Sequence, residues 1–238
     1  MINFRTMTPW RTMTFSILAI DRNTGAMGGA AATGSLCVGG WVLRGDPRSG
    51  MSASQGAAPS TFWGEDVLFR MAAGETAQTA VGAVTAGDSG RAFRQLAALD
   101  RNGNTAAFTG SANTPQTGEH PFDGGIATGN MLASDTVLEA MSACFLNTEG
   151  PLGRRLLDAL SAAREAGGDR RGLLSAALLV TGADRPPLTL RVDFHEHDPI
   201  AALRDLHHRA TTGAYADWTR QVPTLRAPAR TLDTDRTG

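Results

Sequence analysis

The sequence predicts an α+β protein in which two mostly antiparallel sheets lie between two layers of helices. Apolar residues first alternate in short segments that end in turn residues, and they then recur at helical spacing. The resulting order is strands, helices, strands, helices, strands, helix, with hairpin turns in place of the strand-helix alternation of a parallel sheet. The 238 residues show no internal repeat or linker, so we expect a single domain over residues 14–217.

Four short segments near the start of the chain are typical of strands. They are bounded by Gly, Asp, Asn and Ser, which favour turns, and the reversal from Asp21 to Gly25 makes a hairpin of the first two. The segments are residues 14–20, 26–32, 36–43 and 50–55. The first part of the chain is therefore expected to form a sheet.

Helical spacing replaces this pattern after residue 60. Trp63, Val67 and Met71 recur every four residues, and an Ala-rich segment over 76–84 continues toward Gly87, so two helices are expected. A second hairpin follows, with strands over 94–99 and 105–109 around the turn DRNG.

The next segments favour a pair of helices. Ser134 is a helix-capping residue that precedes an apolar face, and Pro151 is typical of the first position of a helix that stops at Gly167. These two helices are expected to pack together.

The last part of the chain favours two strands and a final helix. Residues 173–180 form a nearly continuous apolar run, whereas residues 188–194 alternate between apolar and polar. Asp198 and Pro199 are a cap and first-turn pair that begins the helix. No apolar period remains beyond this helix, so we expect residues 218–238 to be a loosely ordered tail.

Composition excludes several kinds of chemistry. The formal charge of −1 gives no attraction to nucleic acid, and all 22 basic residues are Arg, which excludes a Schiff-base lysine and a P-loop lysine. Cys37 and Cys144 lie apart in apolar surroundings and indicate neither a disulfide nor a metal pair. No apolar run has the length of a membrane span. We therefore expect a soluble cytoplasmic protein that acts on a small molecule, without a cofactor, a nucleic acid or a membrane as partner.

Thr14 is the candidate nucleophile. If Met13 were an initiator that is later removed, Thr14 would carry both a hydroxyl and a free α-amine, which is a nucleophile with its own base. The ordinary pKa of an α-amine is about 7.7 to 8.0, so near neutral pH part of it can accept the hydroxyl proton. The alternative is that Thr14 is simply the first β-branched residue of a strand.

Several longer strings carry a resemblance to a known family. The first begins at Met13, and the others follow in order until about residue 206: MTFSILAIDRNTGAMGGAAATG, LDRNGNTAAFTG, ATGNMLAS, GPLGRRLLDAL, GGDRRGLLSAALLV and LRVDFHEHDPIAALRDLH. They resemble domain-of-unknown-function family 1028, which is described as Ntn-hydrolase-like. The resemblance implies a four-layer αββα sandwich and hydrolysis of an amide bond by an amino-terminal Thr, here Thr14. It also places a cation at Arg44, where in Ntn hydrolases generally it lies beside the nucleophile and lowers the pKa of the amine.

Further polar residues are candidates for the rest of the site. Asn130, in the string TGN, offers a side-chain amide to an oxyanion, and Thr109 and Ser54 are secondary candidates at expected strand ends. Asp21 and Asp169 are each expected either to orient a charged group of the substrate or to cap a loop. For all of them the alternative is ordinary turn chemistry.

The sequence departs from the family pattern in two places. Twelve residues precede Met13, and Thr14 has a free amine only if they are never translated or are removed by cleavage. We treat residues 1–13 as a leader, with an upstream start, self-cleavage and a retained leader as the three explanations. The second departure is Leu174, where the family has Gln before its SAALLV strand.

Two other functions compete with amide hydrolysis. Asp193, His195 and His197 alternate along one expected strand, with His207 and His208 on the next helix, so a metal site is one alternative. The second is a non-catalytic protein that binds a small molecule or joins an assembly on an Ntn-type scaffold. The substrate is expected to be a small amide or peptide-like molecule, and the expected assembly is a homodimer.

Overall fold

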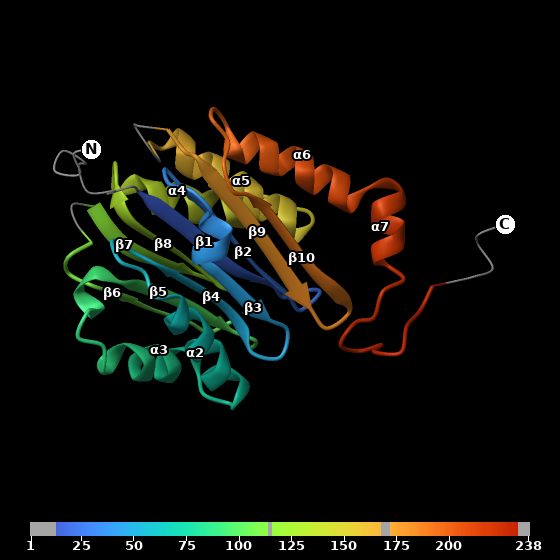
Figure 1. Ribbon diagram of the computed structural model, residues 1–238, viewed down its shortest axis with the longest axis horizontal. Helices are drawn as coiled ribbons and strands as arrows, with labels where there is room; N and C mark the ends of the chain where they lie inside the picture. The colour runs from blue at the N-terminus through green and yellow to red at the C-terminus, as the bar shows by residue number, and fades with distance from the viewer. Residues whose placement is uncertain (1–12, 114–115, 168–171, 233–238) are drawn as a thin grey trace, which may run out of the picture.

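The computed structural model describes residues 13–113, 116–167 and 172–232, and Figure 1 shows their arrangement. Two sheets form, and every strand pair in them is antiparallel. The six-stranded sheet has the order β10-β9-β2-β1-β8-β7, with β1 (Thr14–Asp21), β2 (Ala26–Thr33), β7 (Gln116–Phe122), β8 (Gly125–Leu132), β9 (Ser175–Gly182) and β10 (Arg185–Val192). The four-stranded sheet has the order β3-β4-β5-β6, with β3 (Leu43–Asp46), β4 (Gly50–Gln55), β5 (Gln95–Asp100) and β6 (Thr105–Thr109).

Helices lie against the two sheets on their outer faces (Figure 1). The six-stranded sheet packs against α4 (Thr136–Asn147), α5 (Leu152–Glu165) and α6 (Pro199–Thr211), and the four-stranded sheet packs against α2 (Thr61–Ala72) and α3 (Ala77–Ala86). The shorter helices are α1 (Val38–Trp41), a 3₁₀ turn (Arg91–Phe93) and α7 (Gly213–Thr219). The expected α+β class with two antiparallel sheets is confirmed. No helix of the described residues is long and apolar enough to cross a membrane.

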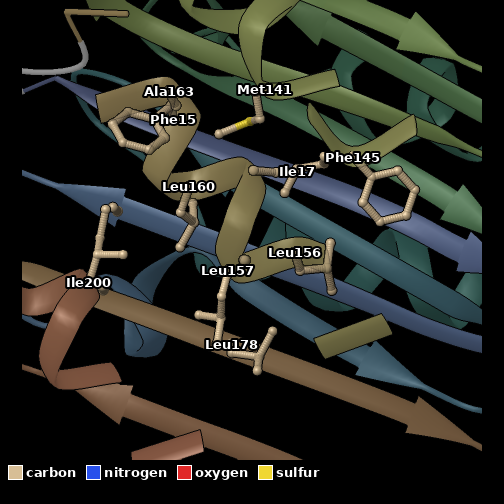
Figure 2. Close-up of a cluster of buried hydrophobic side chains, with 14 of the residues drawn as sticks. Phe15, Ile17, Met141, Phe145, Leu156, Leu157, Leu160, Ala163, Leu178 and Ile200 are labelled. Atoms are coloured by element: carbon tan, nitrogen blue, oxygen red, sulfur yellow. The ribbon is translucent and has the colours of Figure 1, made fainter. Parts of the chain in front are cut away.

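The alternation of β1 divides its side chains between two cores. Phe15 and Ile17 point to the helices and pack with apolar residues of α4 and α5, as Figure 2 shows. Leu18 points the other way, into the core between the two sheets. Because side chains alternate along a strand, Thr14 and Ser16 share the face of Leu18. The two hydroxyls therefore lie between the sheets.

The expected strand over residues 36–43 is wrong. Residues Val38–Trp41 form the short helix α1 instead, and β3 begins at Leu43. Gly39 and Gly40 allow this turn to lie against β10, because an added Cβ at Gly39 would be only 2.7 Å from the Cγ of Arg191. Sequence periodicity could not show this contact, which joins segments far apart in the chain.

Strands β7 and β8 were not expected from the sequence. The string TGN, for which turn chemistry is the alternative to a functional role, lies within β8. The strand needs these small residues: a Cβ at Gly125 would lie 2.6 Å from the carbonyl oxygen of Leu18 on β1. Close approach to a neighbouring strand therefore outweighs low strand propensity here.

The contact between α5 and α6 makes stability depend on pH. His207 on α6 packs so closely against Gly153 of α5 that a Cβ there would lie 2.7 Å from its Nε2. Burial, together with the charges of Arg204 and His208, lowers the pKa of His207. The unfolded chain therefore binds this proton more readily, so stability falls as the pH drops below about 6.5. We expect urea unfolding to show a smaller loss between about pH 7.5 and about pH 5.5 in His207→Asn than in the wild type. Equal losses in both proteins would contradict this assignment.

Candidate functional site

Thr14 lies at the start of β1, at one end of the space between the sheets. Its side chain is 9% exposed. The strand register places Thr33 of β2 directly opposite Thr14 on one side and Asn130 of β8 directly opposite on the other. Residues opposite each other in an antiparallel pair have their Cβ atoms about 5 Å apart. The structure thus brings Thr14 and Asn130 together.

The hydroxyl of Thr14 is the first donor of a short hydrogen-bonded chain. The Thr33 hydroxyl donates to the carbonyl oxygen of Met13 over 2.7 Å, and the backbone N–H of Gly34 donates to the same oxygen over 3.3 Å. Since a hydroxyl has one proton, the 3.0 Å contact between the Thr14 and Thr33 hydroxyls must be a bond that Thr14 donates. While Met13 is attached, the nitrogen of Thr14 is a peptide nitrogen and offers no base.

The contribution of these hydrogen bonds to stability can be measured with the variant Thr33→Val. The substitution conserves shape but leaves the Thr14 hydroxyl and the Met13 carbonyl without this partner, so we expect the free energy of unfolding to fall by about 1 to 3 kcal/mol. Thr181→Val is the matched control, since Thr181 is equally buried and its hydroxyl has no partner among the described residues. The control should be neutral or stabilising in urea unfolding. Equal losses in the two variants would show that the hydroxyl chain contributes nothing.

A cavity of about 370 Å³ opens beside Thr14. Thr14, Thr33 and Gln55 contribute polar atoms to its wall, and Val38, Trp41 and Met131 are among its apolar residues. None of the described residues that line it carries a charge. Its volume is that of a site for a small organic molecule.

Backbone strain is concentrated around this cavity. Cys37, with φ 60°, and Met131, with φ 54°, are the non-glycine residues of the described chain that have positive φ. Met131 lines the cavity, and Cys37 lies between Leu36 and Val38, which also line it. A side chain in this conformation is uncommon, and such strain clusters at functional sites. The cavity is therefore our candidate site.

A buried network fixes the amide side chains behind the cavity. The Nε2 of Gln95 donates to the carbonyl oxygens of Gly118 and Gly129, both at 3.0 Å, so its orientation is set by two groups that can only accept. Its Oε1 must then accept, and it does so from Gln55 Nε2 at 2.8 Å and from Asn130 Nδ2 at 3.3 Å. All three amide side chains are essentially inaccessible to solvent.

This orientation gives Asn130 a second role beside the oxyanion donor that the sequence suggests. The amide nitrogen of Asn130 donates one of its two protons to Gln95 Oε1 over 3.3 Å. Its Oδ1 is buried and has no hydrogen-bond partner among the described residues. A buried acceptor without a partner is costly, so this oxygen is available to a donor that lies next to Thr14.

Two glutamines of the network were missed in the sequence. Ser54 was the candidate, but it points to the helical side of β4 and donates to the carbonyl oxygen of Ser60 over 2.7 Å. Its neighbour Gln55 points between the sheets, lines the cavity and accepts a 2.9 Å hydrogen bond from Ser16. Thr109 does belong to the network, because its hydroxyl lies 2.9 Å from Gln95 Nε2. The signal for them in the sequence was a glutamine near one end of each of two expected strands, residues 50–55 and 94–99.

Arg44 is not brought to Thr14. Its side chain lies on the outer face of the four-stranded sheet, where Nε is 3.5 Å from Glu65 Oε1 of α2 and where a Cβ at Gly64 would be 3.4 Å from its Cγ. The register of β3 explains this placement, because Leu43 points into the core between the sheets and the next residue must point out. The expected cation beside the nucleophile is therefore absent at this position.

We expect Arg44→Met to have little effect. The pair with Glu65 is half-exposed, and such pairs contribute about 1 kcal/mol or less to the free energy of unfolding. Hydrolysis that depends on Thr14 should change by less than about twofold, as for a surface substitution remote from the site. A loss of catalysis in a folded Arg44→Met protein would restore Arg44 as a catalytic cation.

Asp21 lies away from Thr14. Asp21 is at the far end of β1, about 20 Å along the strand, where its Oδ1 accepts from the backbone N–H of Asn23 at 2.9 Å. This is the loop-capping alternative. Asp169 lies outside the described residues.

The histidine-rich segment does not assemble a metal site in the described part of the chain. Asp193 forms an ion pair with Arg191, and the Nδ1 of His195 accepts from the backbone N–H groups of His197 and Asp198. Among the described residues no group of three or more His, Cys, Asp or Glu side chains is placed to hold a metal ion.

Comparison with known proteins identifies the family. The model of the family of unknown function DUF1028 matches residues 14–203. The chain belongs to DUF1028. A crystal structure of a DUF1028 protein, SPO2555 from Silicibacter pomeroyi, is 60% identical to it, with a TM-score of 0.89 over 93% of this chain and 100% of that one.

Two other solved structures are more distant from this DUF1028 chain. They are HslV from Trypanosoma brucei, at 13% identity and a TM-score of 0.42 over 69% of this chain and 98% of that one, and Anbu from Yersinia bercovieri, at 10% identity and a TM-score of 0.36 over 89% and 99%. These values are too low to carry an argument. A comparison with curated proteins finds none that matches.

Proposed function

We propose that this DUF1028 protein is an Ntn-type amidohydrolase that cleaves the C–N bond of a small amide or short peptide, with Thr14 as its amino-terminal nucleophile. One observation carries the proposal: the Thr14 hydroxyl lies on the wall of a cavity large enough for a small molecule, beside strained backbone. The proposal includes the four-layer αββα sandwich of that superfamily. The arrangement of two face-to-face sheets with outer helices supports it.

The chemistry requires a chain that begins at Thr14. The free amine then accepts the hydroxyl proton, and Oγ1 forms a bond to the carbonyl carbon of the substrate. As the C–N bond breaks, the proton passes to the departing nitrogen, and an ester on Thr14 remains. Water hydrolyses this ester, releases the acid and restores the hydroxyl. The buried Oδ1 of Asn130 would accept a hydrogen bond from the amine and keep its lone pair directed at the hydroxyl.

A non-catalytic binding protein on the same scaffold is the second candidate. Met13 favours it, because this residue is only 2% exposed within the main core and its carbonyl oxygen receives two hydrogen bonds. The structure thus accommodates a residue before Thr14 and supplies its carbonyl oxygen with two donors.

Intact mass and amino-terminal sequencing of protein from its native host distinguish the two candidates. A chain that begins at Thr14 is the expected result for the hydrolase. A chain that retains Met13 would leave Thr14 without its base, and the binding function would then lead.

A further inference from the structure

We propose that the cavity beside Thr14 selects an uncharged, mainly apolar group, so that the substrates are neutral amides with an apolar acyl part. This inference rests on the proposed function for the reaction itself, but the binding preference follows from the cavity alone. Three features of the described lining determine this preference: an apolar wall, no charged side chain, and a fixed shape.

The apolar wall comes mainly from α1 and the residues just before it. Val38 and Val42 are almost completely buried, and they form part of the cavity lining. Trp41 and Leu36, which also line the cavity, are 52% and 49% exposed. A ligand that covers large apolar side chains facing water in a cavity binds favourably, because the apolar surface of both partners is removed from water.

A charged group in this cavity would meet no charged side chain among the described lining residues. No described lining residue is charged, and Arg44, the cation predicted for this site, is paired with Glu65 on the outer face of the smaller sheet. The amide of Gln55 is already engaged, because its Oε1 accepts from Ser16 and its Nε2 donates to Gln95. Moving a charge from water to such a place is unfavourable.

The wall is also held in place. The hydroxyl of Ser175 on β9 accepts from the backbone N–H of Val38 at 3.1 Å and donates to the carbonyl oxygen of Ser35 at 2.8 Å. Gly40 lies against β10, where an added Cβ would be 2.9 Å from the Nη2 of Arg191. A wall tied to two strands is preformed, and a preformed apolar site loses little entropy on binding.

The test compares three amides of equal chain length. Hexanamide is neutral, 6-aminohexanamide is a cation and adipamic acid is an anion. Their binding is measured by calorimetry on the full chain carrying Thr14→Ala, which keeps the cavity and lacks the nucleophile. We expect hexanamide to bind at least about tenfold more tightly than either charged amide. Trp41→Ala should weaken its binding, whereas the control Phe69→Ala, at a residue 77% exposed on α2, should leave it unchanged.

Several results would overturn the inference. They are equal binding of the three amides, preference for a charged one, no binding of hexanamide, or equal effects of Trp41→Ala and Phe69→Ala. Hydrolysis is followed separately with the three corresponding p-nitroanilides and a chain that begins at Thr14. If hexanamide binds as expected but no anilide is cleaved, the hydrolase proposal fails and the binding preference stands.

Discussion

Thr14→Ala abolishes hydrolysis and leaves the fold intact, if the hydrolase proposal is correct. The substitution removes the oxygen that forms the ester, so we expect the rate constant to fall by at least about 10⁴-fold. The expected loss of stability is about 1 kcal/mol, because the side chain makes one hydrogen bond, to Thr33. Both proteins should be produced from Met13 as the initiator, since removal of that Met supplies the free amine.

Thr14→Ser is the control for this prediction. It keeps both the hydroxyl and the amine, so it should retain activity. The rate of the wild type should rise with pH through the pKa of the amine, ordinarily about 7.7 to 8.0, because the unprotonated amine is the base. A folded Thr14→Ala protein with wild-type activity would refute the proposed mechanism.

Gln95→Leu should give the largest loss of stability of the substitutions considered. Gln95 is completely buried and lies within hydrogen-bond distance of five groups. Its replacement leaves the carbonyl oxygens of Gly118 and Gly129 and the amides of Gln55 and Asn130 without this partner. The Gly129 carbonyl keeps the Thr117 hydroxyl as a donor, and Gly118 is partly exposed, so the buried groups left unsatisfied are the amides of Gln55 and Asn130. Each costs about 1 to 3 kcal/mol, so we expect the free energy of unfolding to fall by about 2 to 6 kcal/mol.

Urea unfolding, followed by circular dichroism and by fluorescence, measures this loss. Gln78→Leu is the matched control, because Gln78 is exposed on α3 and the change should be within about 0.5 kcal/mol. Gln95→Glu adds a second arm: its carboxylate would face the two glycine carbonyls, so the variant should be less stable at neutral pH than where the carboxyl is protonated. Similar losses in Gln95→Leu and Gln78→Leu would show that the network does not hold the sheets together.

Much of the fold was accessible from the sequence, because local patterns specify local structure. The β1–β2 hairpin, the β5–β6 hairpin and helices α2 to α6 follow from side-chain periodicity and from end signals such as Asp198, whose side chain does accept the capping hydrogen bond. The family resemblance also directed attention to Thr14, and family membership is shown over residues 14–203.

The composition of the site was less accessible, because a difference of one residue changes the face of a strand. The sequence favours Ser54, whereas Gln55 points into the site, and the family resemblance implies a cation at Arg44, which its neighbour Leu43 fixes on the outer face. Only the packing of the two sheets against each other decides which face of a strand lies between them.

The sequence by itself determined the α+β class, most of the elements and the position of Thr14 at the head of a strand. The tertiary structure decided what surrounds Thr14: the opposite residues Thr33 and Asn130, the Gln95 network and the uncharged cavity. The physical reason is distance along the chain. Helices and hairpins depend on neighbours in sequence, whereas this site joins residues up to 116 positions apart through strand register and sheet packing, which no local pattern encodes.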